Sequence, residues 1–422
     1  MFFTDLTKSV AVLLREAYTR IKHNKKGRMA MEKSEKISIL QDVVKIKSVN
    51  GNEEEVAIYL QNLLKKYEIP SELVSYAPNR SSLVAYLGEN REKVLGFSGH
   101  MDVVSEGDES QWTFPPFAAH IEGNKLYGRG STDMKSGLVA MVLAMIELKE
   151  KEVPLNGAVK FLGTVGEEVG ELGAGQLTEK GYADDLSALV IGEPTNYNLM
   201  YAHMGSINYS VVSHGKEAHS SMPEEGINAI NNLNEFITEA NQKIAEVTAN
   251  YENPELGRTI HNVTVIKGGT QVNSIPGQAA LQGNIRSIPE FSNDQVIALL
   301  QKIVDELNKK EKHQLELTID YNKIPVKAEK DSALIQAIQA QFDQPLPLVT
   351  SAGTTDLAEF TKSDNTFDCV VFGPGVTTTA HQVDEYVEID NYLDMIDKYQ
   401  AIAKSYLNIN CQIKLDNSSL HM

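Results

Sequence analysis

Two glycine-rich stretches decide the fold, residues 94–104 (VLGFSGHMDVV) and residues 126–137 (LYGRGSTDMKSG). The first begins with a short apolar run, Val94 to Phe97, which predicts a buried strand. The second leads into an apolar run from about Ser136, which predicts a helix. One histidine and two aspartates therefore lie where a strand ends and where a helix begins. In open α/β sheets, ligands bind at that edge.

These polar residues are of the types that bind divalent metal ions. His100 offers a neutral imidazole, and Asp102 and Asp133 offer carboxylates. Asp102 is placed to accept the second ring N–H of His100 and so to fix its tautomer. Asp133 has two oxygens, enough to bridge two metal ions. Taken alone, the three residues are better explained by loop hydrogen bonds and a helix cap.

Two further strand ends also carry acids. The apolar run 158–164 is followed by Glu167 and Glu168, and the run 188–191 is followed by Glu193. Adjacent carboxylates at a strand end point to different sides, so one can bind a metal while the other faces the substrate as a general base. Acids at three successive strand ends are better explained by a metal-dependent active site than by chance.

Composition limits the class of protein. A chain of 422 residues exceeds one ordinary hydrophobic core, so two domains are expected. A net charge of −18 argues against nucleic-acid binding and indicates no membrane patch. The two cysteines form no metal-binding spacing and exclude a disulfide framework, which favours a reducing cytoplasm. In residues 1–30 the charges follow the apolar part, so we interpret this segment as an N-terminal extension and not as a signal peptide.

Residues 206–324 show a different order of predicted strands and helices from the residues on either side. The predicted order there is strand, helix, strand, strand, helix, strand, which is the ferredoxin-like signature. The flanking residues, 31–205 and 325–422, are predicted to form one larger domain. The sequence therefore predicts an α/β protein in which a larger domain carries an inserted βαββαβ domain.

Collected in order, the motifs resemble those of the M20 metallopeptidase family. The resemblance extends from about residue 33 to about residue 407, and the ordered set is specific although each piece alone is weak. The matching motifs are SGHMDVV (98–104), LYGRGSTDMKSG (126–137), GEE (166–168), GEPT (192–195), GKEAHSSMP (215–223), GGTQVNSIP (268–276), NIRSIPE (284–290), SAGTTD (351–356) and FGPG with AHQVDEY (372–386).

The resemblance implies a centre with two divalent metal ions. Asp133 would bridge the ions, His100 and Glu193 would complete one site, and Glu168 and His381 would complete the other. Zinc is the expected metal, although cobalt and manganese suit similar ligands. The mixed sheet of the larger domain, flanked by helices, would then be the catalytic part of a zinc hydrolase.

The resemblance also implies catalytic roles. Asp102 would orient His100, and Glu167 would be the general acid and base. The inserted domain, residues 206–324, would be a lid that also forms a homodimer. His219 would then reach the active site of the partner subunit and stabilise the oxyanion.

Four residues resemble those that hold the substrate in this family: Arg286, which would bind a carboxylate, and Asn273, Gly353 and Thr354, which would line the pocket. The implied activity is hydrolysis of the acyl amide of an N-acyl amino acid. Among the substrates of this family, the resemblance favours N-succinyl-LL-2,6-diaminopimelate, which would be cleaved to succinate and diaminopimelate in lysine biosynthesis. N-acetylornithine and short peptides stay as alternatives. An inactive binding protein of this fold would be expected to lack a ligand or Glu167, and all are present.

Overall fold

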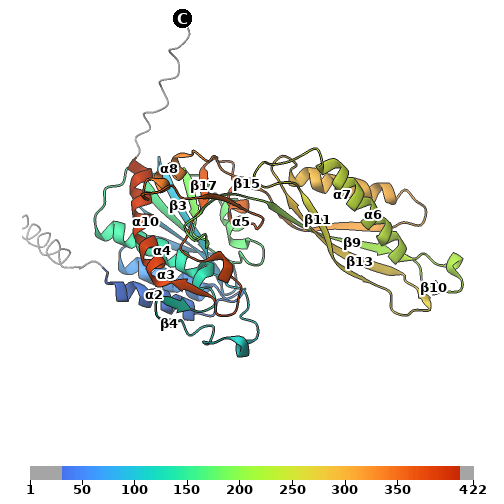
Figure 1. The fold of residues 1–422 in the computed structure, drawn as a ribbon, viewed down its shortest axis with the longest axis horizontal. Helices are drawn as coiled ribbons and strands as arrows, with labels where there is room; N and C mark the ends of the chain where they lie inside the picture. Colours follow the sequence, from blue (N-terminus) through green and yellow to red (C-terminus); the bar gives the residue numbers. More distant parts are fainter. Residues whose placement is uncertain (1–30, 409–422) are drawn as a thin grey trace, which may run out of the picture.

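The computed structural model describes residues 31–408, and the predicted N-terminal extension and Cys411 lie outside the described residues. The described chain forms a large unit, residues 31–203 and 326–408, and a lid unit, residues 205–323. Figure 1 shows the lid unit extending away from one side of the large unit. No helix within residues 31–408 is long and apolar enough to cross a membrane.

A nine-stranded mixed sheet forms the centre of the large unit, as predicted. Its order is β1-β2-β6-β3-β7-β17-β8-β15, and β16 pairs with β8 outside this path. The neighbours β6, β3, β7 and β17 run parallel, whereas β2 and β15 pair antiparallel with theirs. The strands are β1 (Ser71–Ala77), β2 (Arg80–Leu87), β3 (Val94–His100), β6 (Ala158–Thr164), β7 (Ala188–Ile191), β8 (Leu199–His203), β15 (Val326–Lys327), β16 (Leu348–Ser351) and β17 (Asp368–Val371).

Helices cover both faces of this sheet. Along β7, Ala188 and Val190 pack into one core, whereas Leu189 and Ile191 pack into the core on the opposite face. Strands that are buried on both faces need apolar residues at every position, which explains the continuous apolar runs. The first core includes α2 (Lys33–Lys45), α3 (Glu54–Lys66), α4 (Ser136–Glu150), α8 (Ala333–Gln339) and α10 (Ile389–Asn408), and the second includes α5 (Leu172–Glu179) and α9 (Leu357–Phe360).

A small three-stranded sheet brings distant parts of the chain together. It consists of β4 (His120–Glu122), β5 (Lys125–Tyr127) and β18 (Tyr386–Glu388), in the order β18-β5-β4. Tyr386 pairs with Tyr127. The loop before β18 is therefore held beside the glycine-rich stretch that follows β5. The sequence analysis did not predict this sheet.

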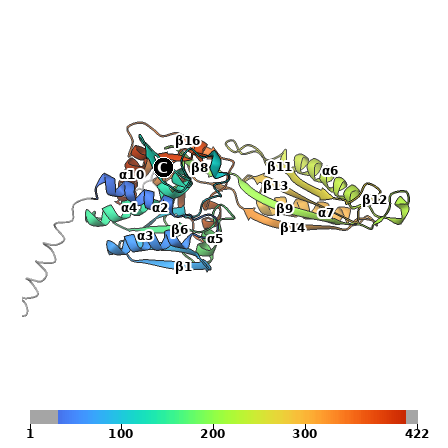
Figure 2. The ribbon, with the colours of Figure 1, turned by 90° about the horizontal axis from the view of Figure 1, so that it is seen from below.

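The lid unit has the predicted βαββαβ order. Its sheet, β11-β13-β9-β14, is antiparallel throughout, and Figures 1 and 2 show α6 and α7 on one face. No helix of residues 31–408 covers the opposite face of this sheet. The elements are β9 (Gly205–His214), α6 (Ala229–Thr248), β11 (Ile260–Gly268), β13 (Gln278–Ser287), α7 (Asn293–Leu307) and β14 (Leu315–Lys323), with short β10 (Ala218–His219) and β12 (Ser274–Ile275) at the far end.

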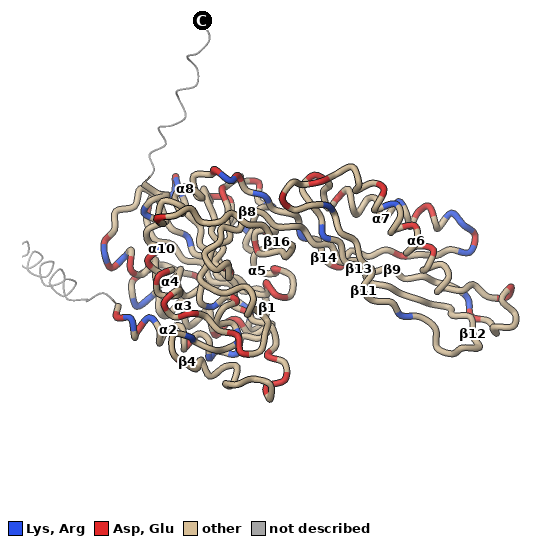
Figure 3. The backbone as a smooth tube through the Cα atoms, in the orientation of Figure 1, with Lys and Arg blue, Asp and Glu red and all other residues tan. Residues whose placement is uncertain are grey.

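Two neighbouring strands attach the lid unit to the large unit. β8 ends at His203 and β9 begins at Gly205, while β14 ends at Lys323 and β15 begins at Val326. We call the paired start of β9 and end of β14 the stem. Figure 3 shows acidic and basic residues interspersed along both units, so the net negative charge is spread over the molecule.

Candidate metal centre and active site

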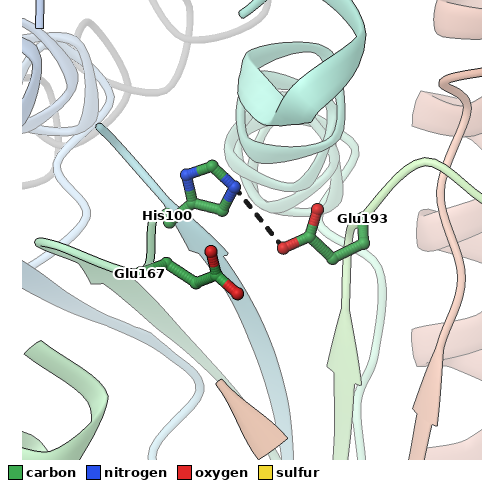
Figure 4. Close-up of side chains that lie close together, drawn as sticks. All are labelled: His100, Glu167 and Glu193. Atoms are coloured by element: carbon green, nitrogen blue, oxygen red, sulfur yellow. Dashed lines mark ion pairs between the residues drawn. The ribbon is translucent and has the colours of Figure 1, made fainter. Parts of the chain in front are cut away.

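The acids predicted at strand ends meet at the carboxyl edge of the large sheet. His100 is the last residue of β3, Glu167 and Glu168 follow β6, and Glu193 follows β7. These three strands are parallel neighbours, so their ends open toward the same space. Figure 4 shows the carboxylates of Glu167 and Glu193 near the His100 ring, with an ion pair between His100 and Glu193.

Asp133 lies between two histidines. The Nε2 of His100 is 3.1 Å from Asp133 Oδ1 and 3.5 Å from Glu193 Oε1. The Nε2 of His381 is 3.3 Å from Asp133 Oδ2 and 2.9 Å from Glu168 Oε1. The five side chains thus form two sets that share Asp133, each with one imidazole and one further carboxylate.

This donor set fits divalent metal ions. Ligand atoms of His100, Asp133 and Glu168 lie within 4.8 Å of one another, as do those of His100, Glu167 and Glu193. Imidazole nitrogens and carboxylate oxygens suit zinc, and also manganese or cobalt. Burial raises the pKa of Glu193 to about 8, because carboxylates crowded in a buried site favour the neutral form. A bound cation would offset that repulsion.

Asp102 holds two parts of the site at once. Its backbone carbonyl accepts the Nδ1–H of His100 at 2.9 Å, which leaves Nε2 of that ring free to bind a metal. Its carboxylate lies 3.6 Å from the same Nδ1 and accepts the backbone N–H groups of Glu167 and Glu168, each at 3.1 Å. Asp102 therefore fixes the ring chiefly through its main chain, while its side chain anchors the loop after β6.

Glu385, which no sequence pattern predicted as a site residue, holds the backbone of Asp133. Its buried carboxylate accepts the backbone N–H of Asp133 at 3.0 Å and pairs with Arg129 at 2.6 Å. Burial raises the pKa of Glu385 to about 7. The Asp133–Met134 peptide bond is cis. The sequence offered one sign of this contact. An acid follows His381 by four residues, and Arg129 in the glycine-rich stretch could neutralise it.

A cavity of about 380 Å³ lies between the loop after β6 and the open face of the lid unit. Of the predicted substrate residues, Arg286 and Thr354 line it, and Gly353 precedes Thr354 on the same loop. Arg286 forms no ion pair with any carboxylate in the described part of the chain. The lining residues are Glu168, Val169, Gly170, Ser206, Asn208, Asn284, Arg286, Tyr321 and Thr354.

The structure places His219 and Asn273 elsewhere. Both lie at the far end of the lid unit, where β10 pairs with β12 and the backbone of Ser220 bonds to the Asn273 carbonyl at 3.0 Å. Figures 1 and 2 show this end pointing away from the large unit. The imidazole of His219 is exposed and lies 2.7 Å from Ser221 Oγ. A single chain therefore does not bring these two residues to the candidate metal centre.

We expect acidification to release divalent ions from this centre. Hydrogen bonds to Asp133 and Glu168 raise the pKa of His381 to about 10. Burial lowers the pKa of His100, but the charge of Glu193 and hydrogen bonds to Asp102, Asp133 and Glu193 together outweigh burial and leave that pKa well above its ordinary value. A metal must displace both protons, so metal occupancy should fall as the pH falls. Metal content after dialysis at pH 5 and pH 8 tests this expectation, and equal contents would contradict it.

Known proteins provide three kinds of match. Residues 96–405 match the peptidase family M20/M25/M40. A relative from Staphylococcus epidermidis, named probable succinyl-diaminopimelate desuccinylase, is 40% identical over 404 residues, covering 89% of this chain and 99% of the relative. A relative of the same name from Staphylococcus aureus is 39% identical over 402 residues, covering 88% of this chain and 98% of the relative.

Solved structures share the fold. An M20 family metallo-carboxypeptidase from Sulfolobus solfataricus has a TM-score of 0.73 at 21% identity, covering 89% of this chain and 99% of that one. The aminopeptidase PepT from Bacillus cereus has a TM-score of 0.69 at 18% identity, covering 90% of this chain and 100% of that one. The chain therefore belongs to peptidase family M20/M25/M40, a family of metal-dependent hydrolases that act on amide bonds.

Proposed function

We propose that this chain is a two-metal amidohydrolase that removes the acyl group from an N-acyl amino acid. The observation that carries the proposal is the pair of imidazoles that share Asp133 beside the carboxylate of Glu167. N-succinyl-LL-2,6-diaminopimelate is the proposed substrate, since relatives near 40% identity over most of the chain are named probable succinyl-diaminopimelate desuccinylases. N-acetylornithine and short peptides are the competing substrates.

The metals, zinc by preference, would be held by the two sets that share Asp133. When bound, they would lower the pKa of a water and polarise the amide carbonyl. The carboxylate of Glu167 has no hydrogen-bond partner among residues 31–408, so it is free to accept a proton. Burial raises the pKa of Glu167 well above its usual range, which suits a group that accepts a proton from water and passes it to the leaving nitrogen.

Hydrolysis of three substrates, measured side by side, tests the substrate. Metal-loaded protein should cleave N-succinyl-diaminopimelate with a higher kcat/KM than N-acetylornithine or a panel of dipeptides. A preference for N-acetylornithine or for a dipeptide would support the proposed amidohydrolase activity but contradict the proposed substrate. A metal-loaded protein that is inactive on all three would contradict the proposed substrate class.

Arg286 should bind a carboxylate of the substrate. The Arg286 guanidinium lines the cavity beside Glu168 and pairs with no carboxylate of residues 31–408. Arg286→Met should therefore lower kcat/KM by about 10- to 100-fold, the value of one hydrogen bond to a charged group. Arg258→Met is the matched control, since Arg258 is an exposed lid arginine paired with Glu252 at 3.0 Å. An equal effect of both substitutions would argue against a direct role for Arg286.

A homodimer would bring His219 and Asn273 to the metal centre of a partner subunit. Strand β11 supports this part of the proposal, because it forms one edge of the lid sheet. Its exposed apolar side chains are Ile260 (48% exposed), Val265 (38%) and Ile266 (57%). An edge strand with apolar side chains is a ready template for pairing with a second copy.

We propose a cytoplasmic location for this protein. Cys369, the cysteine within the described residues, is buried and forms no disulfide. Burial raises the pKa of its thiol to about 12, so the group stays protonated. A reduced, inert thiol is compatible with a reducing compartment.

A further inference from the structure

Lys323 occupies the stem of the lid unit. It is the last residue of β14, and its cross-strand partner is Ser206 near the start of β9. The chain enters and leaves the lid unit at this pair. Although charged, the Lys323 side chain is only 9% exposed. A buried ammonium group needs hydrogen-bond or ion-pair partners. The partners of Lys323 therefore show which part of the molecule the stem contacts.

The partners of Lys323 belong to the large unit. Its Nζ donates to Glu359 Oε1 of α9 at 2.5 Å and to the backbone carbonyl of Gly170 at 2.7 Å, and it lies 3.7 Å from Glu171 Oε2. Tyr321, two residues earlier on β14, donates its hydroxyl to Glu171 Oε1 at 3.2 Å. Two side chains of one lid strand therefore hold the loop that follows β6.

That loop carries Glu167 between two anchors. On one side, the Asp102 carboxylate holds the backbone N–H groups of Glu167 and Glu168. On the other side, the Glu167 carbonyl accepts the N–H groups of Gly170 and Glu171, each at 3.1 Å. Backbone hydrogen bonds thus close the turn from Glu167 to Glu171. Lys323 contacts the end of this turn, at Gly170 and Glu171. One anchor belongs to the large unit and the other belongs to the lid unit.

We propose that Lys323 is a positioning residue that sets the place of Glu167 and makes it depend on the orientation of the lid unit. When the lid unit turns about its stem, Nζ moves with β14 while Asp102 stays with the large sheet. Separating the ammonium from Glu171 and from the Gly170 carbonyl would leave buried polar groups of the loop unpaired, so the loop follows the strand. The inference rests on the proposed role of Glu167 as the general base.

Lys323→Met, Lys323→Arg and Lys362→Met test this inference in the full-length, metal-loaded protein. Lys362 is the matched control, because it donates to the same Glu359 Oε1 at 2.7 Å without contacting Gly170. Lys323→Met should lower kcat by about 10- to 100-fold, the effect of moving a catalytic group by about 1 Å, while KM and metal content stay near wild type. Lys323→Arg should recover most of kcat, since a guanidinium also donates to a carbonyl, and Lys362→Met should leave kcat unchanged.

Glu359 keeps Lys362 as a partner in Lys323→Met, so the carboxylate left without a cation is Glu171. The combined substitution Lys323→Met with Glu171→Gln removes that charge, so that an unpaired buried charge does not decide the result. Wild-type kcat in this variant would overturn the inference, as would Lys323→Arg being as slow as Lys323→Met. Loss of metal together with kcat would also overturn it, because the residue would then only support the fold. Full activity of Glu167→Gln would instead overturn the proposed function.

Discussion

Replacing Glu167 with alanine should leave both metal ions bound and lower kcat by about 10³-fold or more. Glu167 lies beside the ligand sets, yet its carboxylate bonds to no other described side chain. General acid–base catalysis typically contributes about 10²- to 10⁴-fold to a rate, and here one group would serve as both base and acid. Metal content per chain and kcat on N-succinyl-diaminopimelate are the two measurements.

The adjacent Glu168 provides the matched comparison. Its Oε1 lies 2.9 Å from His381 Nε2, so Glu168→Ala should lose metal together with activity. Metal content would then depend on Glu168 and not on its neighbour Glu167. Near-normal turnover of Glu167→Ala would remove that residue from its role, and loss of metal from Glu167→Ala would make it a ligand.

Replacing His219 with alanine should lower kcat by about 10²- to 10³-fold without changing metal content. The expected effect is that of removing one oxyanion donor. Because His219 lies at the far end of the lid unit, its imidazole would act at the metal centre of the partner subunit. The His219→Ala chain therefore keeps an intact metal centre but lacks the donor it would give to its partner.

Mixed dimers test whether His219 acts across the subunits. A dimer of one His219→Ala chain and one Glu167→Ala chain contains one complete active site, built from Glu167 of the first chain and His219 of the second. Co-expression of the two chains should therefore restore about a quarter of wild-type activity, since half of randomly paired dimers are mixed and half of their sites are complete. Purified mixed dimers without activity would show that His219 does not act in trans.

The strand ends of the large sheet were predictable because of how the sheet is buried. Strands β3, β6 and β7 are covered on both faces, so each appears as a continuous apolar run that stops at a polar residue. Parallel neighbours end at one edge, which brings His100, Glu167 and Glu193 together without knowledge of any contact. The βαββαβ order of the lid unit, which the structure confirms, could also be predicted from the sequence. Its helices and strands have distinct periodicities of apolar residues.

Contacts between distant loops were not predictable in this way. Glu385 holds the backbone of Asp133 through a bond between residues 252 positions apart, and no local pattern signals it. The loop of His381 is placed by β18, a strand of three residues, which is too short to show a periodicity. The ammonium of Lys323 gave no sign of burial in the sequence, because lysines are usually exposed.

The two-strand attachment of the lid unit also means that the large sheet does not need the lid unit for its own strand pairing. His203 and Val326 are direct partners in the large sheet, on the antiparallel strands β8 and β15. A two-residue hairpin turn could join strands so placed, and every strand of the large sheet would keep its neighbours. The lid unit therefore occupies the place of a hairpin turn, so replacing it with such a turn would leave the candidate metal ligands on an unchanged sheet.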